Sequence, residues 1–313
     1  MKKPLKITLI VVGVLIAIPV VFVGTTATVN AVATNVEAAD RQVYGELVDV
    51  GGKKMNVVDQ GSGDQTIVLL PGQGTASPAI DFVPLIDQLD DTYRVITVEP
   101  FGYGRSDDTD SPRTTANIAS EVHEAVSALG VDEYVLAGHS IAGIYALEYV
   151  ERFRDEVTAF VGIDTSVPGQ PGMDAELPLG LFGTLKNLGL VRLIAGLSDD
   201  PYAGTPYTAA QKEQLALFAN KNSMSPTMLN EMEHIAPNFA EAESRTFPAD
   251  LPVLLFAQQN NTGVEGWAEL HEKQAANAER GELILLDAGH YLHHTKSPEI
   301  AEAMKRFLSG ASA

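Results

Sequence analysis

The sequence predicts an α/β protein: a doubly wound, mostly parallel sheet with an inserted helical segment, preceded by an N-terminal transmembrane helix. Three observations lead to this expectation. Short apolar runs closed by turns recur along the chain, stretches of helical periodicity lie between them, and residues 7–23 form an uncharged apolar stretch. Strands that alternate with helices place helices on both faces of a parallel sheet.

The N-terminal stretch has the length and flanks of a membrane anchor. Its apolar part covers about 17–23 residues, which is enough to cross a bilayer. Three lysines precede it (Lys2, Lys3 and Lys6), and the next charge is Glu37. Basic residues before a span and acidic residues after it predict an N-inside, C-outside orientation. We therefore expect residues 1–36 to form an anchor and stalk in the cell membrane, with the rest of the chain extracytoplasmic.

A cleaved secretory signal is the alternative, because Ala31-Val32-Ala33 has the small residues of a cleavage site. The apolar run is longer than the usual core of such a signal, so we favour the uncleaved anchor. In both cases the remainder of the chain is exported.

Composition limits the classes of partner. The 313 residues suit one large domain with an insertion. Lysine and arginine number 21 against 41 aspartates and glutamates, a formal net charge of −20, which argues against nucleic acid as a partner. The chain has no cysteine, which excludes disulfides, thiolate metal sites and a cysteine nucleophile.

The core is expected in residues 41–166 and 247–313. Glu46–Val50 and Lys54–Val58 flank Gly51-Gly52 and predict a hairpin. The predicted buried parallel strands are Thr66–Leu70, Arg94–Val98, Tyr134–Ala137, Ala159–Ile163, Pro252–Ala257 and Leu283–Leu286. The predicted helices between them are Thr115–Leu129, Ile141–Phe153, Trp267–Ala278 and Pro298–Leu308.

The alternation is interrupted once, at residues 167–246, where no strand pattern occurs. Helical patches fill this segment, namely Leu179–Leu197, Ala209–Asn220 and Pro226–Phe239. We expect a helical cap over the carboxyl ends of the strands, where open α/β sheets bind ligands. An insertion unrelated to the ligand site is the alternative.

The sequence Gly138-His139-Ser140-Ile141-Ala142 follows a predicted strand and enters a predicted helix. This is the pattern of a nucleophile elbow, a sharp turn that exposes the serine hydroxyl at the top of a sheet. The glycine usual at the end of the elbow is replaced by Ala142, whose methyl group requires slightly looser packing. We therefore identify Ser140 as the candidate nucleophile.

A glycine-rich turn, Pro71-Gly72-Gln73-Gly74, ends an earlier strand. The oxyanion that forms when a serine attacks a carbonyl needs preorganised N–H donors. We expect one donor at the backbone of Ile141, directly after the serine, and another at Gln73 in this turn. A simple strand-ending turn is the alternative.

Near the C-terminus, Gly289-His290 follows the last predicted strand. Histidine titrates near neutral pH, so it can take the proton of a serine and pass it to a leaving group. We identify His290 as the candidate base. His293 and His294 follow; without a neighbouring cysteine or acidic motif, we expect them at the surface or behind the site rather than on a metal.

The acid that orients the histidine is less clearly marked. Asp164 ends a strand 24 residues after Ser140 and is our first choice. The later loop, where many hydrolases carry this acid, reads Gln258-Gln-Asn-Asn261-Thr and has no carboxylate before Glu265. Glu265, or an arrangement with an asparagine or no acid, remains an alternative.

From about residue 44 to its end, the chain resembles the α/β-hydrolase superfamily, especially membrane-anchored hydrolases of Gram-positive bacteria. The residues that carry the resemblance are Leu70–Thr75, Glu99–Gly104, His139–Tyr145, Gly162–Asp164 and Gly289–His294. The resemblance implies Ser140 as nucleophile and His290 as base, and it supports Asp164 as the acid by position.

These features together predict a serine esterase that works without metal or organic cofactor. The insertion is rich in apolar side chains, including Leu179, Leu181, Phe182, Leu185, Leu188 and Leu190, which favours a small-molecule ester with a hydrophobic portion. An amidase, peptidase or acyltransferase with the same residues is the nearest alternative. A slow-turnover ligand sensor on the same fold is a second one.

Overall fold

A computed structural model describes residues 3–310, with side chains from Leu5 onward. Lys2, one of the lysines in the topology prediction, and residues 311–313 of the predicted core lie outside this range. Two compact units divide the chain. One comprises the residues up to 41 together with Pro178–Pro201, and the other comprises Gln42–Leu177 and the chain from Tyr202 onward. Part of the predicted insertion thus groups with the N-terminal helix.

The second unit is built on an eight-stranded sheet with the order β1-β2-β4-β3-β5-β6-β7-β8. β1 and β2 form an antiparallel hairpin, and β2 pairs antiparallel with β4. All remaining pairs are parallel. The strands are Glu46–Val50, Lys53–Gln60, Thr66–Leu70, Arg94–Glu99, Tyr134–His139, Val157–Ile163, Val253–Gln258 and Gly281–Leu286. The predicted doubly wound, mostly parallel sheet is confirmed.

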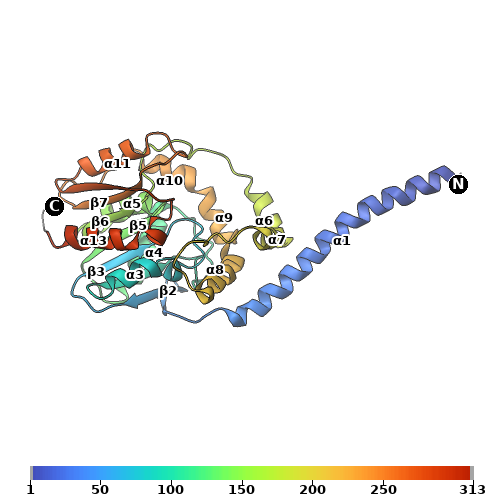
Figure 1. Cartoon of the computed structure of the whole chain (residues 1–313), viewed down its shortest axis with the longest axis horizontal. Helices are drawn as coiled ribbons and strands as arrows, with labels where there is room; N and C mark the ends of the chain where they lie inside the picture. Colours follow the sequence, from blue (N-terminus) through green and yellow to red (C-terminus); the bar gives the residue numbers. More distant parts are fainter. Residues whose placement is uncertain (1–2, 311–313) are drawn as a thin grey trace. The chain divides into compact units, whose positions relative to one another are not determined.

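Helices cover both faces of this sheet and enclose two apolar cores (Figure 1). On one face, α4 (Thr115–Ser127) packs against α5 (Ala142–Arg152), with α11 (Trp267–Ala276) against β7 and β8. On the other face, α3 (Val83–Leu89) packs against α13 (Ser297–Leu308). The middle strands β3, β5 and β6 are buried on both faces, because each crossover helix shields the strand beneath it.

Between β6 and β7 the described chain is helical, as the sequence predicts, but two predicted helices are divided. Leu179–Leu197 forms α6 (Leu179–Asn187) and α7 (Leu190–Leu197), which meet at Gly189 in a left-handed conformation. Pro226–Phe239 forms α9 (Pro226–Glu233) and α10 (Ile235–Ala242). α8 (Ala209–Asn222) begins at Thr208 in a capping box.

In the first unit, α1 extends over Lys3–Asp40, so the small-residue segment predicted as a stalk is also helical. From Leu5 onward α1 is long and apolar enough to cross a membrane. Arg192 on α7 donates hydrogen bonds to Asn30 and Thr34 and forms an ion pair with Glu37. These polar contacts fasten the α6–α7 pair to the end of α1 that follows the apolar stretch.

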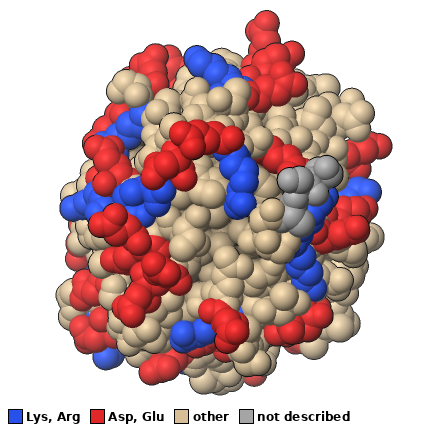
Figure 2. All heavy atoms as spheres, turned by 90° about the vertical axis from the view of Figure 1, so that its left-hand side faces the viewer, with Lys and Arg blue, Asp and Glu red and all other residues tan. Residues whose placement is uncertain are grey.

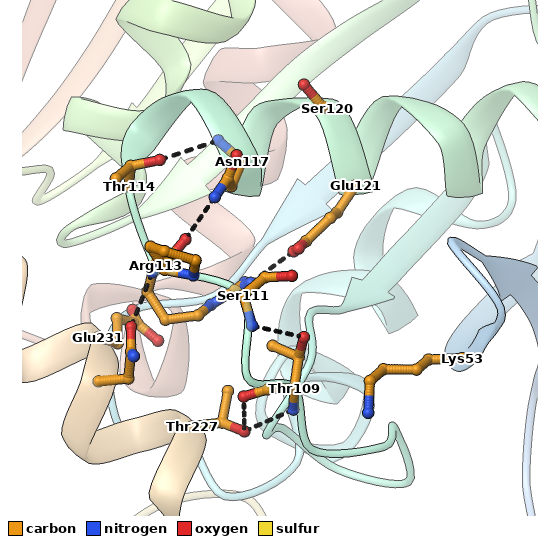
Figure 3. A network of polar contacts seen from close by, with 12 residues as sticks. Lys53, Thr109, Ser111, Arg113, Thr114, Asn117, Ser120, Glu121, Thr227 and Glu231 are labelled. Carbon is orange, nitrogen blue, oxygen red and sulfur yellow. Dashed lines mark hydrogen bonds and ion pairs between the residues drawn. The ribbon is translucent and has the colours of Figure 1, made fainter.

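A buried polar network attaches the insertion helices of the second unit to the core (Figure 3). Arg113, fully buried in the loop before α4, forms a 2.6 Å ion pair with Glu121 on α4, and Glu231 on α9 lies beside it. Burial raises the pKa of Glu231, while Arg113 and the hydroxyls of Tyr145 and Tyr103 oppose that shift. Because Tyr103 and Tyr145 donate to Glu231, α9 is held against the turn after β4 and against α5.

The acidic excess is visible on the surface. Aspartate and glutamate side chains are spread over the face in Figure 2, and lysines and arginines lie among them. Several basic residues form ion pairs with acidic neighbours, such as Arg94 with Asp59 and Lys305 with Asp91. A surface of this kind offers no large basic area on this face for a polyanion.

Candidate active site

Ser140 lies in a sharp turn between the end of β5 and the start of α5. Its φ of 55° falls in the left-handed region, which is unusual for a residue other than glycine. The turn is tied down from both sides: Ser140 N–H donates to Ile163 C=O, and Ser140 C=O accepts from Ser166 N–H at 2.8 Å. The strained backbone therefore projects the serine side chain above the carboxyl end of the sheet, as the elbow pattern predicts.

The methyl group of Ala142 is accommodated by a glycine one turn earlier. Ala142 is fully buried, and a Cβ atom placed on Gly138 would meet the Ala142 methyl at 2.7 Å. Gly72 is equally constrained, because its Cβ would lie 2.6 Å from His139 Nδ1 and 3.0 Å from Ser140 Cβ. Small residues thus let the turn after β3 approach the elbow directly.

His290 connects the serine to a buried aspartate. Its Nε2 lies 2.9 Å from Ser140 Oγ, and its Nδ1 lies 2.6 Å from Asp164 Oδ2. The three residues come from the ends of β5, β6 and β8, whose carboxyl ends share one edge of the sheet. The histidine side chain is 41% exposed, whereas the Asp164 side chain is 0% exposed. The imidazole is therefore accessible from the solvent side, while the carboxylate that it contacts is shielded from water.

Asp164 is held by four hydrogen bonds. Besides His290 Nδ1, the donors are Gln258 N–H at 2.8 Å, Gln258 Nε2 at 2.6 Å and Trp267 Nε1 at 2.8 Å. Burial raises the pKa of Asp164, but the hydrogen bonds from His290 and Gln258 outweigh it, so the pKa lies below its ordinary value. The carboxylate is accordingly ionised at neutral pH and can orient the imidazole and stabilise its cation.

The residues considered as alternative acids lie elsewhere. Asn261 Oδ1 accepts from Gly263 N–H and Val264 N–H in a local turn, and Glu265 is exposed. Within residues 3–310, the carboxylate hydrogen-bonded to His290 is that of Asp164. The loop after β7 nevertheless contributes to the site, because Gln258 at its start binds Asp164 through both its backbone and its side chain.

His139 supports the loop that carries His290. Its Nε2 donates to His290 C=O at 3.1 Å, and the two rings lie 4.6 Å apart. Burial, then the neighbouring His293 and His290, lowers the pKa of His139 well below its ordinary value, so the ring is neutral. His139 thus faces the backbone of His290 rather than the serine hydroxyl.

The two predicted oxyanion donors border the same space as Ser140 and His290. Ile141 directly precedes α5, and Gln73 lies in the turn after β3. In the part of the chain that the structure describes, the backbone N–H groups of Gln73 and Ile141 have no protein acceptor. Such groups remain available to a ligand oxygen.

A cavity of about 550 Å³ opens over the serine, and all its lining residues belong to the second unit. One part of the lining is amide-rich, with Gln73, Gln170, Gln258, Asn260 and Asn261. Another part is apolar, with Ile141, Met173, Ile235, Val264 and Trp267. No lysine, arginine, aspartate or glutamate of the described chain lines it. The cavity therefore suits a neutral molecule with both polar and apolar portions.

Some features of the site could not be read from the sequence. Trp267 and Gln258 carry no motif; only the position of Gln258 at the end of a core strand could have suggested a role. Of the two positions expected for His293 and His294, at the surface or behind the site, the structure shows the second: both are buried, and the ring of His293 lies 4.8 Å from that of His139. Each binds the carboxylate of Asp81, an acidic partner more than 200 residues earlier in the chain.

A parallel sheet with a serine elbow, a following histidine and a buried aspartate defines a class, the α/β-hydrolase fold. The chain belongs to the alpha/beta hydrolase family, whose sequence model matches residues 67–303. Among known proteins, it is 29% identical over 230 residues to the uncharacterized protein YbdG of Bacillus subtilis, an alignment that covers 71% of this chain and 70% of YbdG.

Other similarities span several kinds of hydrolase. A 2-hydroxy-6-oxononadienedioate/2-hydroxy-6-oxononatrienedioate hydrolase of Paraburkholderia phymatum is 32% identical over 168 residues, covering 50% of this chain and 58% of that protein. The enol-lactonase structure from Burkholderia xenovorans superposes with a TM-score of 0.63 at 17% identity, covering 84% of this chain and all of that one. Cfl2 of Burkholderia cenocepacia gives 0.65 at 16% identity, with coverages of 85% and 99%. The two structures establish the shared fold.

The lowered pKa of Asp164 makes a prediction about stability and pH. A carboxylate whose folded-state pKa is depressed stabilises the fold above its unfolded pKa of about 3.9, and this contribution is lost as the pH falls through the folded-state value. Asp164→Asn should therefore lower the free energy of unfolding by about 1–3 kcal/mol at pH 7, because charged acceptors bind more strongly than neutral ones. The deficit should shrink as the pH falls below about 4.

Denaturant unfolding of both proteins between pH 3 and pH 7 measures this difference. The control is Asp287→Asn, an exposed aspartate in the loop that carries His290, which should change stability by less than about 0.5 kcal/mol. A deficit for Asp164→Asn that stays constant over the whole pH range would contradict the assignment of an ionised, hydrogen-bonded carboxylate.

Proposed function

We propose that this protein is a membrane-tethered, extracytoplasmic serine hydrolase that cleaves carboxylic esters through an acyl-enzyme on Ser140. The observation that carries the proposal is the continuous hydrogen-bond chain from Asp164 through His290 to Ser140 at the floor of a cavity. A nucleophile, a base in contact with it and a buried acid that orients the base are what acyl transfer requires.

In the proposed reaction, His290 Nε2 takes the proton of Ser140 as Oγ attacks the ester carbonyl carbon. The carbonyl oxygen becomes an oxyanion and accepts hydrogen bonds from the N–H groups of Gln73 and Ile141. Each such donor contributes about 3–4 kcal/mol to transition-state stabilisation in comparable enzymes. His290 then gives its proton to the leaving alkoxide, and the alcohol departs while the acyl group stays on Ser140.

Water completes the cycle by the same route. His290 removes a proton from a water molecule that attacks the acyl carbon, and the oxyanion forms again between Gln73 and Ile141. Collapse of this intermediate returns the proton to Ser140 Oγ and releases the carboxylic acid. Throughout, Asp164 remains ionised and stabilises the imidazolium of His290 through the 2.6 Å hydrogen bond to Nδ1.

We favour a carboxylic ester for two reasons. The contacts among Ser140, His290 and Asp164 suit attack on a carbonyl carbon, and the cavity lining suits a neutral substrate. One structural neighbour is an enol-lactonase, a hydrolase of a cyclic ester. Epoxide hydrolysis on this fold needs a carboxylate nucleophile where Ser140 stands. The apolar part of the cavity, Met173, Ile235, Val264 and Trp267, supports an ester with a hydrophobic portion. The leucine-rich segment from Leu179 to Leu190 belongs to the first unit, and its role toward the substrate stays a prediction.

Labelling by a fluorophosphonate should identify the activated serine. Intact-mass analysis of the full-length chain in detergent should show one adduct per chain, and the adduct should be absent from Ser140→Ala. Asp164→Asn should slow labelling by about 100-fold or more, because the imidazole loses its orienting charge. Ser166→Ala is the matched control, since Ser166 lines the same cavity without contacting His290, and it should label normally. A folded wild-type chain that forms no adduct would contradict the proposal and favour a ligand sensor.

The lining of the cavity predicts the preferred ester. Neutral medium-chain p-nitrophenyl esters should have a kcat/KM about tenfold higher than the acetate, because two buried methylene groups are worth about 1.6 kcal/mol. Esters of the same length that end in a carboxylate should be poorer substrates. Met173→Gln should reduce the chain-length preference, and Met173→Leu should preserve it. Equal rates with short polar and medium-chain esters would remove support for a hydrophobic portion.

The absence of cysteine permits a direct test of the membrane topology. A single cysteine at the exposed Ser62 should react with a membrane-impermeant maleimide on intact cells, whereas one at Lys3 should react only after lysis. The protein should also stay in the membrane pellet after alkaline carbonate extraction. Release of a shortened chain into the medium would show instead that the N-terminal helix is a cleaved signal.

A further inference from the structure

A second cluster of ionisable side chains lies outside the proposed active site. Asp81 is the last residue of the short helix α2 (Pro78–Asp81), and His293 and His294 lie in α12 (Leu292–Thr295). His293 Nε2 is 2.7 Å from Asp81 Oδ2, and His294 Nε2 is 2.9 Å from Asp81 Oδ1. The ligand-type atoms of all three residues fall within 4.8 Å of one another.

The cluster is buried, and its members contact one another rather than solvent. Asp81 and its two partners are each less than 9% exposed. Burial raises the pKa of Asp81, but the contacts with His293 and His294 outweigh it and hold the pKa far below its ordinary value. Burial lowers the pKa of His293 in turn. No lysine or arginine in residues 3–310 forms an ion pair with Asp81, so the two imidazoles are the side chains that contact its carboxylate.

We propose that Asp81, His293 and His294 bind a divalent transition-metal ion of the Zn²⁺ type. Two imidazole nitrogens and one carboxylate are a ligand set that Zn²⁺ and its neighbours in the first transition series accept. Bonds of about 2.0–2.1 Å in tetrahedral geometry place ligand atoms about 3.3 Å apart. The two nitrogen–oxygen separations, 2.7 Å to Oδ2 and 2.9 Å to Oδ1, would widen by about half an ångström, and all ligand-type atoms already lie within 4.8 Å of one another.

A metal ion can replace the protons through which the two histidines contact Asp81. Because the ionised Asp81 can only accept, both Nε2 atoms donate to it and carry the imidazole protons. A metal ion bound at Nε2 replaces the proton there, and a neutral imidazole then carries its proton on Nδ1. His293 Nδ1 has no hydrogen-bond partner within the described chain and can take the proton.

A cavity provides the route to the cluster. It measures about 440 Å³, and His294 forms part of its wall together with Pro84, Asp87, Gln88 and Thr205. On the protein side, the ring of Tyr291 stacks on that of His294, and Tyr207 donates to the backbone carbonyl of Asp81. The ligands are thus oriented by packed neighbours, and His294 is the ligand that borders the cavity, so an ion would enter past its ring.

The ion would join two segments that serve the active site. α2 follows the turn that carries Gln73, and α12 begins two residues after His290. The ring of His139 lies 4.6 Å from that of His290 and 4.8 Å from that of His293. The proposed site is therefore structural, holding the histidine loop in place from behind, and it takes no part in the transfer of the acyl group.

Metal titration of the full-length chain in detergent tests the proposal. After treatment with EDTA and exchange into chelator-free buffer, Zn²⁺ should bind with 1:1 stoichiometry by calorimetry and raise the unfolding temperature. Asp81→Asn and His294→Gln should each weaken binding by 30-fold or more. The matched controls are Asp87→Asn, on the wall of the same cavity, and His234→Gln, which binds only the backbone of its own helix; both should bind as the wild type does.

A second measurement needs no variant. Co²⁺ added to the wild-type chain should give the visible absorption of a low-coordinate site with nitrogen and oxygen ligands, and Zn²⁺ should abolish it. Near-UV circular dichroism shows whether each protein is folded, and fluorophosphonate labelling reports the serine site separately. A folded wild-type chain that binds neither metal saturably would overturn the proposal, as would unchanged affinity in folded Asp81→Asn and His294→Gln proteins.

Discussion

The buried charge of Asp164 determines how the loops at the carboxyl edge of the sheet are arranged. A carboxylate shielded from water is stable only when donors surround it, and here the donors come from three elements that are distant in sequence. Gln258 ends β7, Trp267 begins α11 and His290 follows β8. The hydrogen bonds to this one carboxylate therefore fix the ends of three elements. The orientation of His290 toward Ser140 is a consequence of these hydrogen bonds.

Most of the core was predictable because its signals are local. Each predicted strand differs from the observed one by at most a few residues, since a buried parallel strand is a short apolar run between turns. Ser140 and His290 were also identifiable, because an elbow and a glycine–histidine pair stand at strand ends. Asp164 could be chosen only as one of several alternatives; its four hydrogen bonds depend on partners that the sequence does not place.

The features that the sequence did not predict depend on contacts between residues that are far apart in the chain. The helices of the insertion end where Gly189 and His234 interrupt them, whereas apolar periodicity continues through both positions. His293 and His294 were expected at the surface or behind the site, and their partner Asp81 was not foreseen because no acidic residue accompanies them in sequence. Asp81 reaches them through the packing of α3 against α13 and α12.

Two buried aspartates contact the histidine loop. Asp164 contacts His290, Asp81 contacts His293 and His294, and the hydrogen-bond donors around the two carboxylates differ. Amide, indole and imidazole donors from several elements form hydrogen bonds to Asp164, so its carboxylate is held in one fixed orientation. Asp81 meets two imidazoles and its backbone carbonyl meets one phenol, a set of partners that includes the ligand types of the proposed metal site. His139, neutral and packed between the two histidine rings, separates these environments. The loop thus presents the half-exposed imidazole of His290 toward the cavity, while the carboxylate of Asp81 holds the buried imidazoles of His293 and His294.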